Sequence, residues 1–408
     1  MSHPSLPVAP SSGALDPALT AAPAYPPLRS QPLGNLDRIE PQTGTQQPHL
    51  RQLGINPNHW YVVARSTEVT TQPFGVTLWK QAIALYRDSQ GQVHAMEDRC
   101  PHRQVKLSDG QVRGDELECA YHGWRFNSAG QCTAIPYLSD QQRIPACQIR
   151  CYPVTEQDGF IWLFPGDPEV LQSRELRPMG VPEWDHLNYI GSVAPIDCHI
   201  HYSFLIENLM DMHHGHLHDN YQAWAEARLD SIEETGDRVH AHYQAQSYYR
   251  IDKIWSVSQL FFPSLRQLHP EPLDVSYLYP HWAASLGQDF KIYCLLCPID
   301  ETHTRAYLLH FTSLNGFPRL HKLSEGFRRA MKNLFFGSAN GLLNGLIRQD
   351  VWMMEQEQQA FLSDPNRRTY EVNRALPAVQ RLIRRQANVG SVPSATNSRK
   401  TDSAAIAD

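Results

Sequence analysis

The sequence predicts an α+β protein of two domains, in which a small all-β domain is followed by a larger domain that mixes helices and strands. The chain of 408 residues is long enough for two hydrophobic cores. Short runs of β-branched and aromatic residues begin near His59 and alternate with turn residues. Longer stretches with the apolar spacing of helices occur only in the second half of the chain.

Residues 1–48 are predicted to be disordered. They are rich in Pro, Ala, Ser and Gln and show no hydrophobic periodicity, so they cannot bury enough apolar surface to offset the entropy of ordering. A signal peptide would need a basic start and an apolar run, and a transit peptide would normally carry more arginine than the single Arg29 before Arg38. We therefore expect a cytoplasmic protein, with organelle targeting as the alternative.

The all-β domain is predicted over residues 55–168. Its hairpin turn is Asp88-Ser-Gln-Gly91, and it closes near Gly159–Phe164, after which residues 165–168 begin a polar linker. The expected strands are Trp60–Ala64, Val76–Trp79, Ile83–Arg87 and Val93–Met96.

The second domain is predicted over residues 185–388, followed by a polar tail at 389–408. Its first helix is expected from about Tyr202 to His218. The expected strands are Tyr243–Tyr249, Val275–Tyr279, Phe290–Cys297 and Arg305–Phe311, and the later helices are Leu323–Phe336, Leu342–Leu362 and Ala378–Gln386.

Composition excludes several classes of protein. A net charge of −6 gives no bulk attraction to polyanions, which argues against a nucleic-acid partner. No stretch approaches 18 uninterrupted apolar residues, so we expect no membrane span. Eight cysteines without regular spacing do not suggest the disulfide framework of a small secreted domain. The 20 histidines are numerous and clustered, as metal chemistry would require.

Two cysteine and histidine pairs form the first candidate metal site. Cys100-Pro-His102 is followed, after sixteen intervening residues, by Cys119-Ala-Tyr-His122, and each pair comes just after a strand-like run. Two thiolates and two imidazoles are the ligand set of a [2Fe-2S] cluster in which both histidines bind one iron. The alternatives are a structural zinc site or unrelated core residues, but zinc fingers usually pair Cys with Cys and His with His.

This double motif resembles the Rieske family over about residues 60–165, and the resemblance implies a [2Fe-2S] cluster held by these four residues. The respiratory members carry an extra cysteine in each loop, where this chain has Val105 and Tyr121, so it resembles the lower-potential branch. The remaining cysteines lack metal-type spacing and are expected to be inert packing residues: Cys132, Cys147, Cys151 and Cys198. Cys294 and Cys297, although spaced like a redox pair, fall in a strand and are expected in the core.

A second candidate metal site lies on the helix predicted around residue 210. Two histidines and one carboxylate on one side of a metal form the facial triad of non-heme Fe(II) oxygenases. His214 and His218 are four residues apart and would share a helix face. A histidine-rich surface helix is the competing interpretation.

This stretch resembles the Rieske oxygenases, in which an acidic residue and an aspartate precede the histidines, as Glu207 and Asp211 do here. The histidine spacing is one residue shorter than usual, which leaves open whether His213 or His214 pairs with His218. The resemblance implies a late carboxylate ligand, for which Asp350 is the first choice and Glu355 the second.

In that family the residue matching Asp211 connects a cluster histidine to an iron histidine of a neighbouring subunit, which implies a homo-oligomer, most simply a trimer. Asn208 belongs to the same motif and is a candidate catalytic residue with Asp211. The resemblance further implies a helix-grip (START-like) catalytic domain with an antiparallel sheet.

The function implied is O₂-dependent hydroxylation or dealkylation of an aromatic or polycyclic substrate, with electrons from a separate ferredoxin or flavin reductase. The pattern is nearest to the monooxygenase and demethylase branch and to the pheophorbide and chlorophyllide a oxygenase-like branch. One alternative is a Rieske electron-transfer protein with a non-catalytic C-terminal domain, favoured by the short histidine spacing. Another is a desaturase-like or ring-cyclising oxidase that uses the same two sites.

Overall fold

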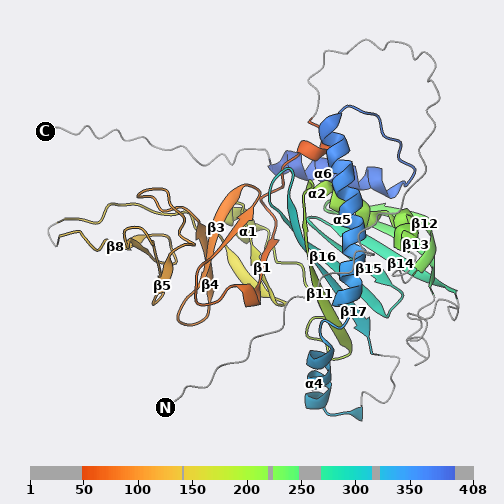
Figure 1. Cartoon of the computed structure of the whole chain (residues 1–408), viewed down its shortest axis with the longest axis horizontal. Helices are drawn as coiled ribbons and strands as arrows, with labels where there is room; N and C mark the ends of the chain where they lie inside the picture. Colours follow the sequence, from red (N-terminus) through yellow and green to blue (C-terminus); the bar gives the residue numbers. More distant parts are fainter. Residues whose placement is uncertain (1–47, 140–141, 219–223, 248–267, 315–321, 391–408) are drawn as a thin grey trace, which may run out of the picture. The chain divides into compact units, whose positions relative to one another are not determined.

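The N-terminal part of the computed structural model is a set of small antiparallel sheets (Figure 1). The structure describes residues 48–139, 142–218, 224–247, 268–314 and 322–390, so the segment predicted to be disordered and most of the polar tail lie outside the described residues. The sheets have the strand orders β1-β10-β9, β2-β3-β4 and β5-β6-β7-β8. Their strands are β1 (Tyr61–Arg65), β2 (Phe74–Leu78), β3 (Gln81–Arg87), β4 (Val93–Glu97), β5 (Gln111–Arg113), β6 (Glu116–Glu118), β7 (Arg125–Phe126), β8 (Cys132–Ala134), β9 (Val154–Gln157) and β10 (Phe160–Leu163).

Strands β1 to β4 coincide with the four predicted runs, and the predicted turn joins β3 to β4. The amide of Gly91 donates to the Asp88 carbonyl at 3.0 Å, and Gly91 has a φ of 80°, a backbone conformation that favours glycine. Strands β5 to β8 were not predicted because runs of two or three residues are too short to show alternation.

The predicted linker after residue 165 is partly wrong, because it contains helix α1 (Pro168–Ser173). The Asp167 carboxylate accepts a hydrogen bond from the amide of Glu169 at 2.9 Å, and Pro168 occupies the first helical turn. An aspartate followed by proline favours a helix start as strongly as a turn, so this pattern alone does not distinguish helix α1 from a linker.

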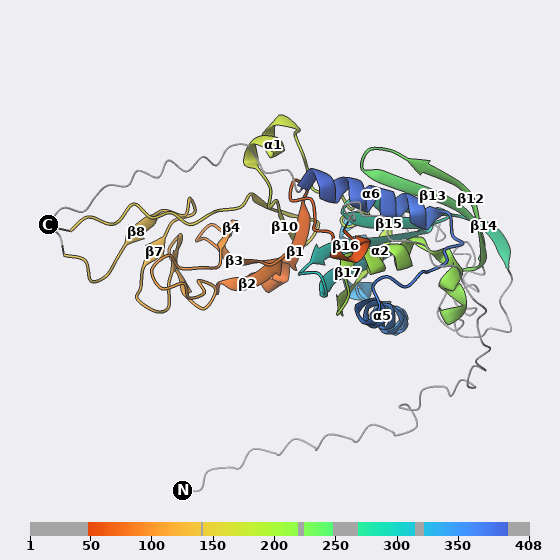
Figure 2. The same cartoon turned by 90° about the horizontal axis from the view of Figure 1, so that it is seen from above.

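The C-terminal part is a seven-stranded antiparallel sheet with helices packed on it, as Figures 1 and 2 show. The strand order is β11-β17-β16-β15-β14-β13-β12. The strands are β11 (Tyr189–Cys198), β12 (Trp224–Glu234), β13 (Arg238–Ser247), β14 (His269–Leu278), β15 (His281–Leu286), β16 (Phe290–Pro298) and β17 (Thr304–Ser313). The helices are α2 (Tyr202–Met210), α4 (Glu325–Phe335), α5 (Asn340–Ser363) and α6 (Ala375–Gly390).

Alternation along β13 places its buried side chains on one face of the sheet. On β13, Val239, Ala241, Tyr243 and Ala245 are buried, and α6 packs against this strand. Helix α5 contacts β11, and α2 lies against both α5 and α6. The α+β class with an all-β domain followed by an antiparallel sheet and helices is confirmed.

The helix predicted from Tyr202 to His218 is too long. Helix α2 ends at Met210, Asp211 has an extended backbone, and a 3₁₀ turn, η4, runs from Met212 to His218. The Asp211 carboxylate accepts a hydrogen bond from the amide of His213 at 3.0 Å, a local bond that competes with helix continuation. The histidines therefore lie on a tight turn and not on a regular α-helix.

Candidate metal centres

The loop that contains Cys100 and the loop that contains Cys119 are closed by the same pattern of backbone hydrogen bonds. In the loop after β4, the amide of Cys100 donates to the Val105 carbonyl at 2.9 Å and the amide of Gln104 donates to the Cys100 carbonyl at 2.9 Å. Between β6 and β7, Cys119 and Trp124 form the matching bond at 2.8 Å. Gly123 donates to Cys119, and both Gln104 and Gly123 have positive φ. The two motifs thus fold into equivalent loops.

The thiols and imidazoles of these loops face each other in pairs. Cys100 and Cys119 are both buried, and burial, followed by the neighbouring Cys119 thiol, raises the pKa of Cys100 to about 11. The rings of His102 and His122 have centroids 4.5 Å apart. Trp124 stacks on His102 with an interplanar angle of 6°, which fixes the orientation of that imidazole.

The pairing fits a two-iron cluster better than a single zinc ion. Among the described residues, the groups whose donor atoms all lie within 4.8 Å of one another do not include these four residues. A zinc ion would need all four donors around one point, whereas a [2Fe-2S] cluster takes two on each iron. His102 Nδ1 is buried and makes no hydrogen bond with the described residues, so a metal ligand bond would satisfy it.

A second group of donors converges from the η4 turn and α5. His218 Nε2 is 3.0 Å from Asp350 Oδ1, and His214 Nε2 is 3.7 Å from the same oxygen. One donor atom from each residue lies within 4.8 Å of the others. The His218 side chain is 5% exposed, while those of His214 and Asp350 are partly exposed, so the group is reachable from one side.

Neighbouring amides hold this group in place. The Nδ1–H of His218 donates a hydrogen bond to Gln349 Oε1 at 2.8 Å. This leaves Nε2, which faces Asp350, as the ring nitrogen available to bind a metal ion. Asn208 Nδ2 lies 3.5 Å from Asp350 Oδ1. No sequence motif pointed to Gln349, although its position next to Asp350 on α5 was a usable signal.

The charge distribution suits a cation between the three residues. Burial lowers the pKa of His214 and favours the neutral imidazole that binds metals. Burial would also lower the pKa of His218, but hydrogen bonds and charge from Asp350 outweigh it and raise that pKa. His214 Nδ1 is buried and has no hydrogen-bond partner among the described residues. Two imidazoles and one carboxylate therefore fit Fe(II).

The structure separates the remaining sequence candidates from this group. His213 is 42% exposed in its side chain, and its Nδ1 is 3.6 Å from Asp211 Oδ1. Glu207 forms an ion pair with Arg51 and accepts a hydrogen bond from Gln380 at 3.0 Å. Glu355, on the same helix as Asp350, accepts a hydrogen bond from the amide of His199 at 3.0 Å. The structure thus brings together His214, His218 and Asp350, but not His213 or Glu355.

Asp211 is held by a residue that sequence reasoning missed. The buried Asn373 donates from Nδ2 to Asp211 Oδ1 at 2.8 Å and to the Tyr243 hydroxyl at 3.1 Å. Tyr243 in turn donates to the Met210 carbonyl at 2.9 Å. Asn373 comes just before α6, about 160 positions from Asp211, so no local sequence pattern could reveal the contact.

Another histidine and aspartate group lies on β13 and β14. His242 Nδ1 is 2.7 Å from Asp274 Oδ1, and His240 Nδ1 pairs with Ser276 Oγ. These hydrogen bonds between neighbouring strands account for both imidazoles. We therefore assign this group to the sheet surface.

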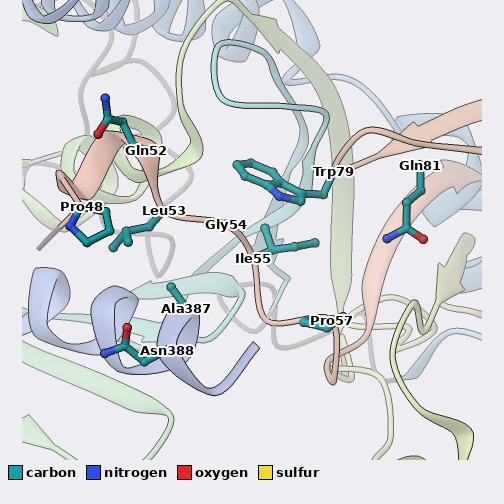
Figure 3. Close-up of a pocket in the computed structure, with 10 residues that line it drawn as sticks. All are labelled: Pro48, Gln52, Leu53, Gly54, Ile55, Pro57, Trp79, Gln81, Ala387 and Asn388. Atoms are coloured by element: carbon teal, nitrogen blue, oxygen red, sulfur yellow. The ribbon is translucent and has the colours of Figure 1, made fainter. Parts of the chain in front are cut away.

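A pocket of about 420 Å³ lies apart from the residues of both candidate metal centres (Figure 3). Leu53, Gly54 and Ile55 line one wall, and Trp79 and the end of α6 at Ala387 complete it. None of its lining residues belongs to either donor group. Among the described residues, no helix is both long and apolar enough to cross a membrane.

Comparison with known proteins identifies both halves of the chain. The Rieske [2Fe-2S] domain family matches residues 59–153, and the vanillate O-demethylase oxygenase C-terminal domain family matches residues 198–388. The chain is 33% identical over 343 residues to a 4β-methylsterol monooxygenase of Methylococcus capsulatus, which covers 82% of this chain and 89% of that protein.

Two further similarities concern dicamba-oxidising proteins. The chain is 36% identical over 176 residues to the oxygenase component of dicamba O-demethylase from Stenotrophomonas maltophilia, which covers 43% of this chain and only 50% of that protein. The crystal structure of dicamba monooxygenase bound to dicamba has a TM-score of 0.63 at 23% identity and covers 82% of this chain and 97% of that one. At this identity the structural similarity concerns the fold.

Proposed function

Because this chain belongs to the Rieske non-heme iron oxygenases, we propose that it oxidises a methyl group carried by a polycyclic or aromatic substrate. The family uses a [2Fe-2S] cluster, a mononuclear iron and O₂, and the chain is an oxidoreductase of this kind. The convergence of His214 Nε2, His218 Nε2 and Asp350 Oδ1 is the observation that carries the proposal, because it supplies the open-sided donor set that the chemistry requires.

The substrate class is inferred from the relative aligned over most of its length. That protein is a methylsterol monooxygenase, and a demethylase aligned over half its length also bears a methyl-directed name. Both names refer to a methyl group, carried either by a ring or by a heteroatom attached to a ring. A polycyclic substrate is the first choice because the sterol enzyme matches across both domains.

The site residues have distinct proposed roles. Cys100, His102, Cys119 and His122 hold the cluster, and His214, His218 and Asp350 hold the mononuclear iron. The bound groups supply electrons and O₂ activation; the chain supplies orientation and proton control. Gln349 keeps the proton of His218 on Nδ1, and Asn208 donates toward Asp350 and so helps to orient this carboxylate.

Electron transfer is proposed to use Asp211, which requires more than one chain. Asp211 lies at the end of α2, between the buried Asn373 and the half-exposed His213. Its side chain is 28% exposed, so a residue of a second chain could reach it. We propose a homo-oligomer, most simply a trimer, that receives electrons from a separate ferredoxin or flavin reductase.

The experiment that tests the function is a single turnover with labelled oxygen. The protein is reduced without O₂, mixed with a 4-methylsterol or an aryl methyl ether, and exposed to ¹⁸O₂. We expect a labelled hydroxymethyl sterol, or formaldehyde from the ether. Iron-loaded protein that consumes its reducing equivalents but yields no labelled product from either class would contradict the proposed substrate chemistry.

Replacing Gln349 with leucine is expected to weaken Fe(II) binding by about 10- to 100-fold, the usual effect of losing an outer hydrogen bond to a metal-binding histidine. Leucine has similar volume but cannot accept the His218 Nδ1 proton. Fe(II) titration of the iron-depleted protein measures the change, with cluster absorbance as the folding control. Glutamate at this position keeps the acceptor and should restore affinity; equal weakening in both variants would contradict the positioning role.

A further inference from the structure

Two half-buried cysteines lie opposite each other beside the second cluster loop. The segments containing Cys132 and Cys147 form an antiparallel bridge at Gln131 and Gln148. The amide of Cys132 donates to the Cys147 carbonyl at 3.4 Å. Residues directly opposite in such a pair have Cα atoms about 4.5–5.5 Å apart, within the range that a disulfide spans. The backbone therefore already meets the main geometric requirement for a disulfide.

The two thiols also contact each other. Burial, followed by the charge and hydrogen bond of Cys147, raises the pKa of Cys132 to about 12. Both are free in this structure and only partly buried, whereas Cys198, Cys294 and Cys297 are buried. A small oxidant in solution can therefore reach this pair more readily than the other three.

Residues 132–136 pack beside the second cluster loop. Strand β8 begins at Cys132 and pairs with β7, which directly follows the loop. Pro136 packs on Gly123, where an added Cβ would come within 2.9 Å of the proline Cγ. Cys132 and Cys147 also pack against the hydrophobic group that includes Cys100 and Cys119. A bond between them would hold residues 132–136 against the loop that carries Cys119 and His122.

We propose that Cys132 and Cys147 are a reversible disulfide site, oxidised by a low-molecular-weight disulfide such as oxidised glutathione, and that the bond holds residues 132–136 against the cluster loop. This goes beyond the oxygenase function, because bond formation is measured without substrate or turnover. Val105 and Tyr121 occupy the positions at which the respiratory members carry their extra cysteines, so this chain cannot form that disulfide. The Cys132–Cys147 bond would instead constrain the second cluster loop through the residues that pack on it.

The reaction is balanced by thiol–disulfide exchange. One cysteine thiolate attacks a sulfur of oxidised glutathione, which breaks the glutathione disulfide and releases one glutathione thiolate. The second cysteine then displaces the other glutathione from the mixed disulfide. The cysteine pair loses two electrons and two protons, and two molecules of reduced glutathione form.

The sequence makes the bond easy to map. Trypsin cleaves after Arg125, Arg143 and Arg150, which places Cys132, Cys147 and Cys151 on three separate peptides. The cluster-loaded protein is incubated with oxidised glutathione, alkylated and digested without reduction. We expect one linked species of 126–143 with 144–150, reversed by dithiothreitol. Independent glutathionylation of each cysteine, or full alkylation of both after oxidation, would overturn the proposal.

The consequence for the cluster has its own readout. Protein with the Cys132–Cys147 disulfide should lose its visible cluster absorbance to a chelator about 10-fold more slowly than protein with both thiols free. This effect is smaller than the full stabilisation expected for closing a loop of about 15 residues. Cys132→Ser and Cys147→Ser should each abolish this difference and retain the reduced-state rate. Cys151→Ser removes a half-buried cysteine of the same hydrophobic group and should keep the difference. An unchanged rate after complete bond formation would refute this constraint on the cluster loop.

Discussion

Asp350→Ala is expected to yield a folded protein that retains its [2Fe-2S] cluster but neither binds mononuclear iron nor forms product. Among the described residues, Asp350 Oδ1 is the anionic donor that faces both His218 Nε2 and His214 Nε2. Loss of an outer hydrogen bond already costs such sites about 10- to 100-fold, so loss of a ligand should cost more than about 100-fold in activity. Iron per chain, cluster absorbance and labelled product are measured on the same sample.

Glu355→Ala is the matched control, because this carboxylate lies on the same helix and was the second candidate in the sequence. In the structure it accepts the amide of His199 instead of facing the histidine pair. It should therefore keep its iron and most of its activity. Iron loss in the Glu355 variant, with normal iron in the Asp350 variant, would reverse the assignment.

Asp211→Asn is expected to keep both metal centres but to slow substrate-dependent reoxidation of the reduced cluster by about 10- to 100-fold, as for loss of a charged partner of metal-binding histidines. Asparagine is isosteric and can still accept from Asn373 and from the amide of His213, so the end of α2 should keep its shape. What is lost is the negative charge that is proposed to connect a cluster histidine of one chain to an iron histidine of another. Stopped-flow absorbance of the cluster after mixing with O₂ and substrate measures the rate.

His213→Ala is the control for this experiment, because it removes the neighbouring imidazole and leaves the Asp211 charge. It should retain mononuclear iron, whereas His214→Ala should lose it. Mixed oligomers of Asp350→Ala and Cys119→Ala chains should recover part of the activity that each parent lacks, if electrons pass between chains. Normal reoxidation in Asp211→Asn would contradict its role in electron transfer.

Much of the molecule could be predicted because its chemistry is local in sequence. The cluster loops repeat a short motif, and the same hydrogen bonds close both loops, so the residue types and their spacing carry the geometry. Most longer strands and the later helices were expected, because their apolar periodicity is strong. His218 was also predicted as a ligand, and the family resemblance gave Asp350 as the first choice for the carboxylate.

The remaining features depend on contacts between distant residues. The spacing from His214 to His218 is one residue shorter than the family pattern, which left the choice between His213 and His214 open; the 3₁₀ turn after Asp211 brings the rings of His214 and His218 to Asp350. Strands β11, β12 and β15 were missed for different reasons: β11 contains Gly191 and Pro195, β12 is largely polar, and β15 is short. Asn373 and the Cys132–Cys147 pair become neighbours only through tertiary folding.

Iron and acid-labile sulfide, measured together in protein purified without O₂, test the two-centre account most directly. We expect about three irons and about two sulfides per chain, since the cluster holds two irons and the His214, His218 and Asp350 group holds one. The third iron should disappear in Asp350→Ala. A wild-type ratio of about two irons to two sulfides, unchanged after Fe(II) is added, would contradict the account and leave the chain an electron carrier.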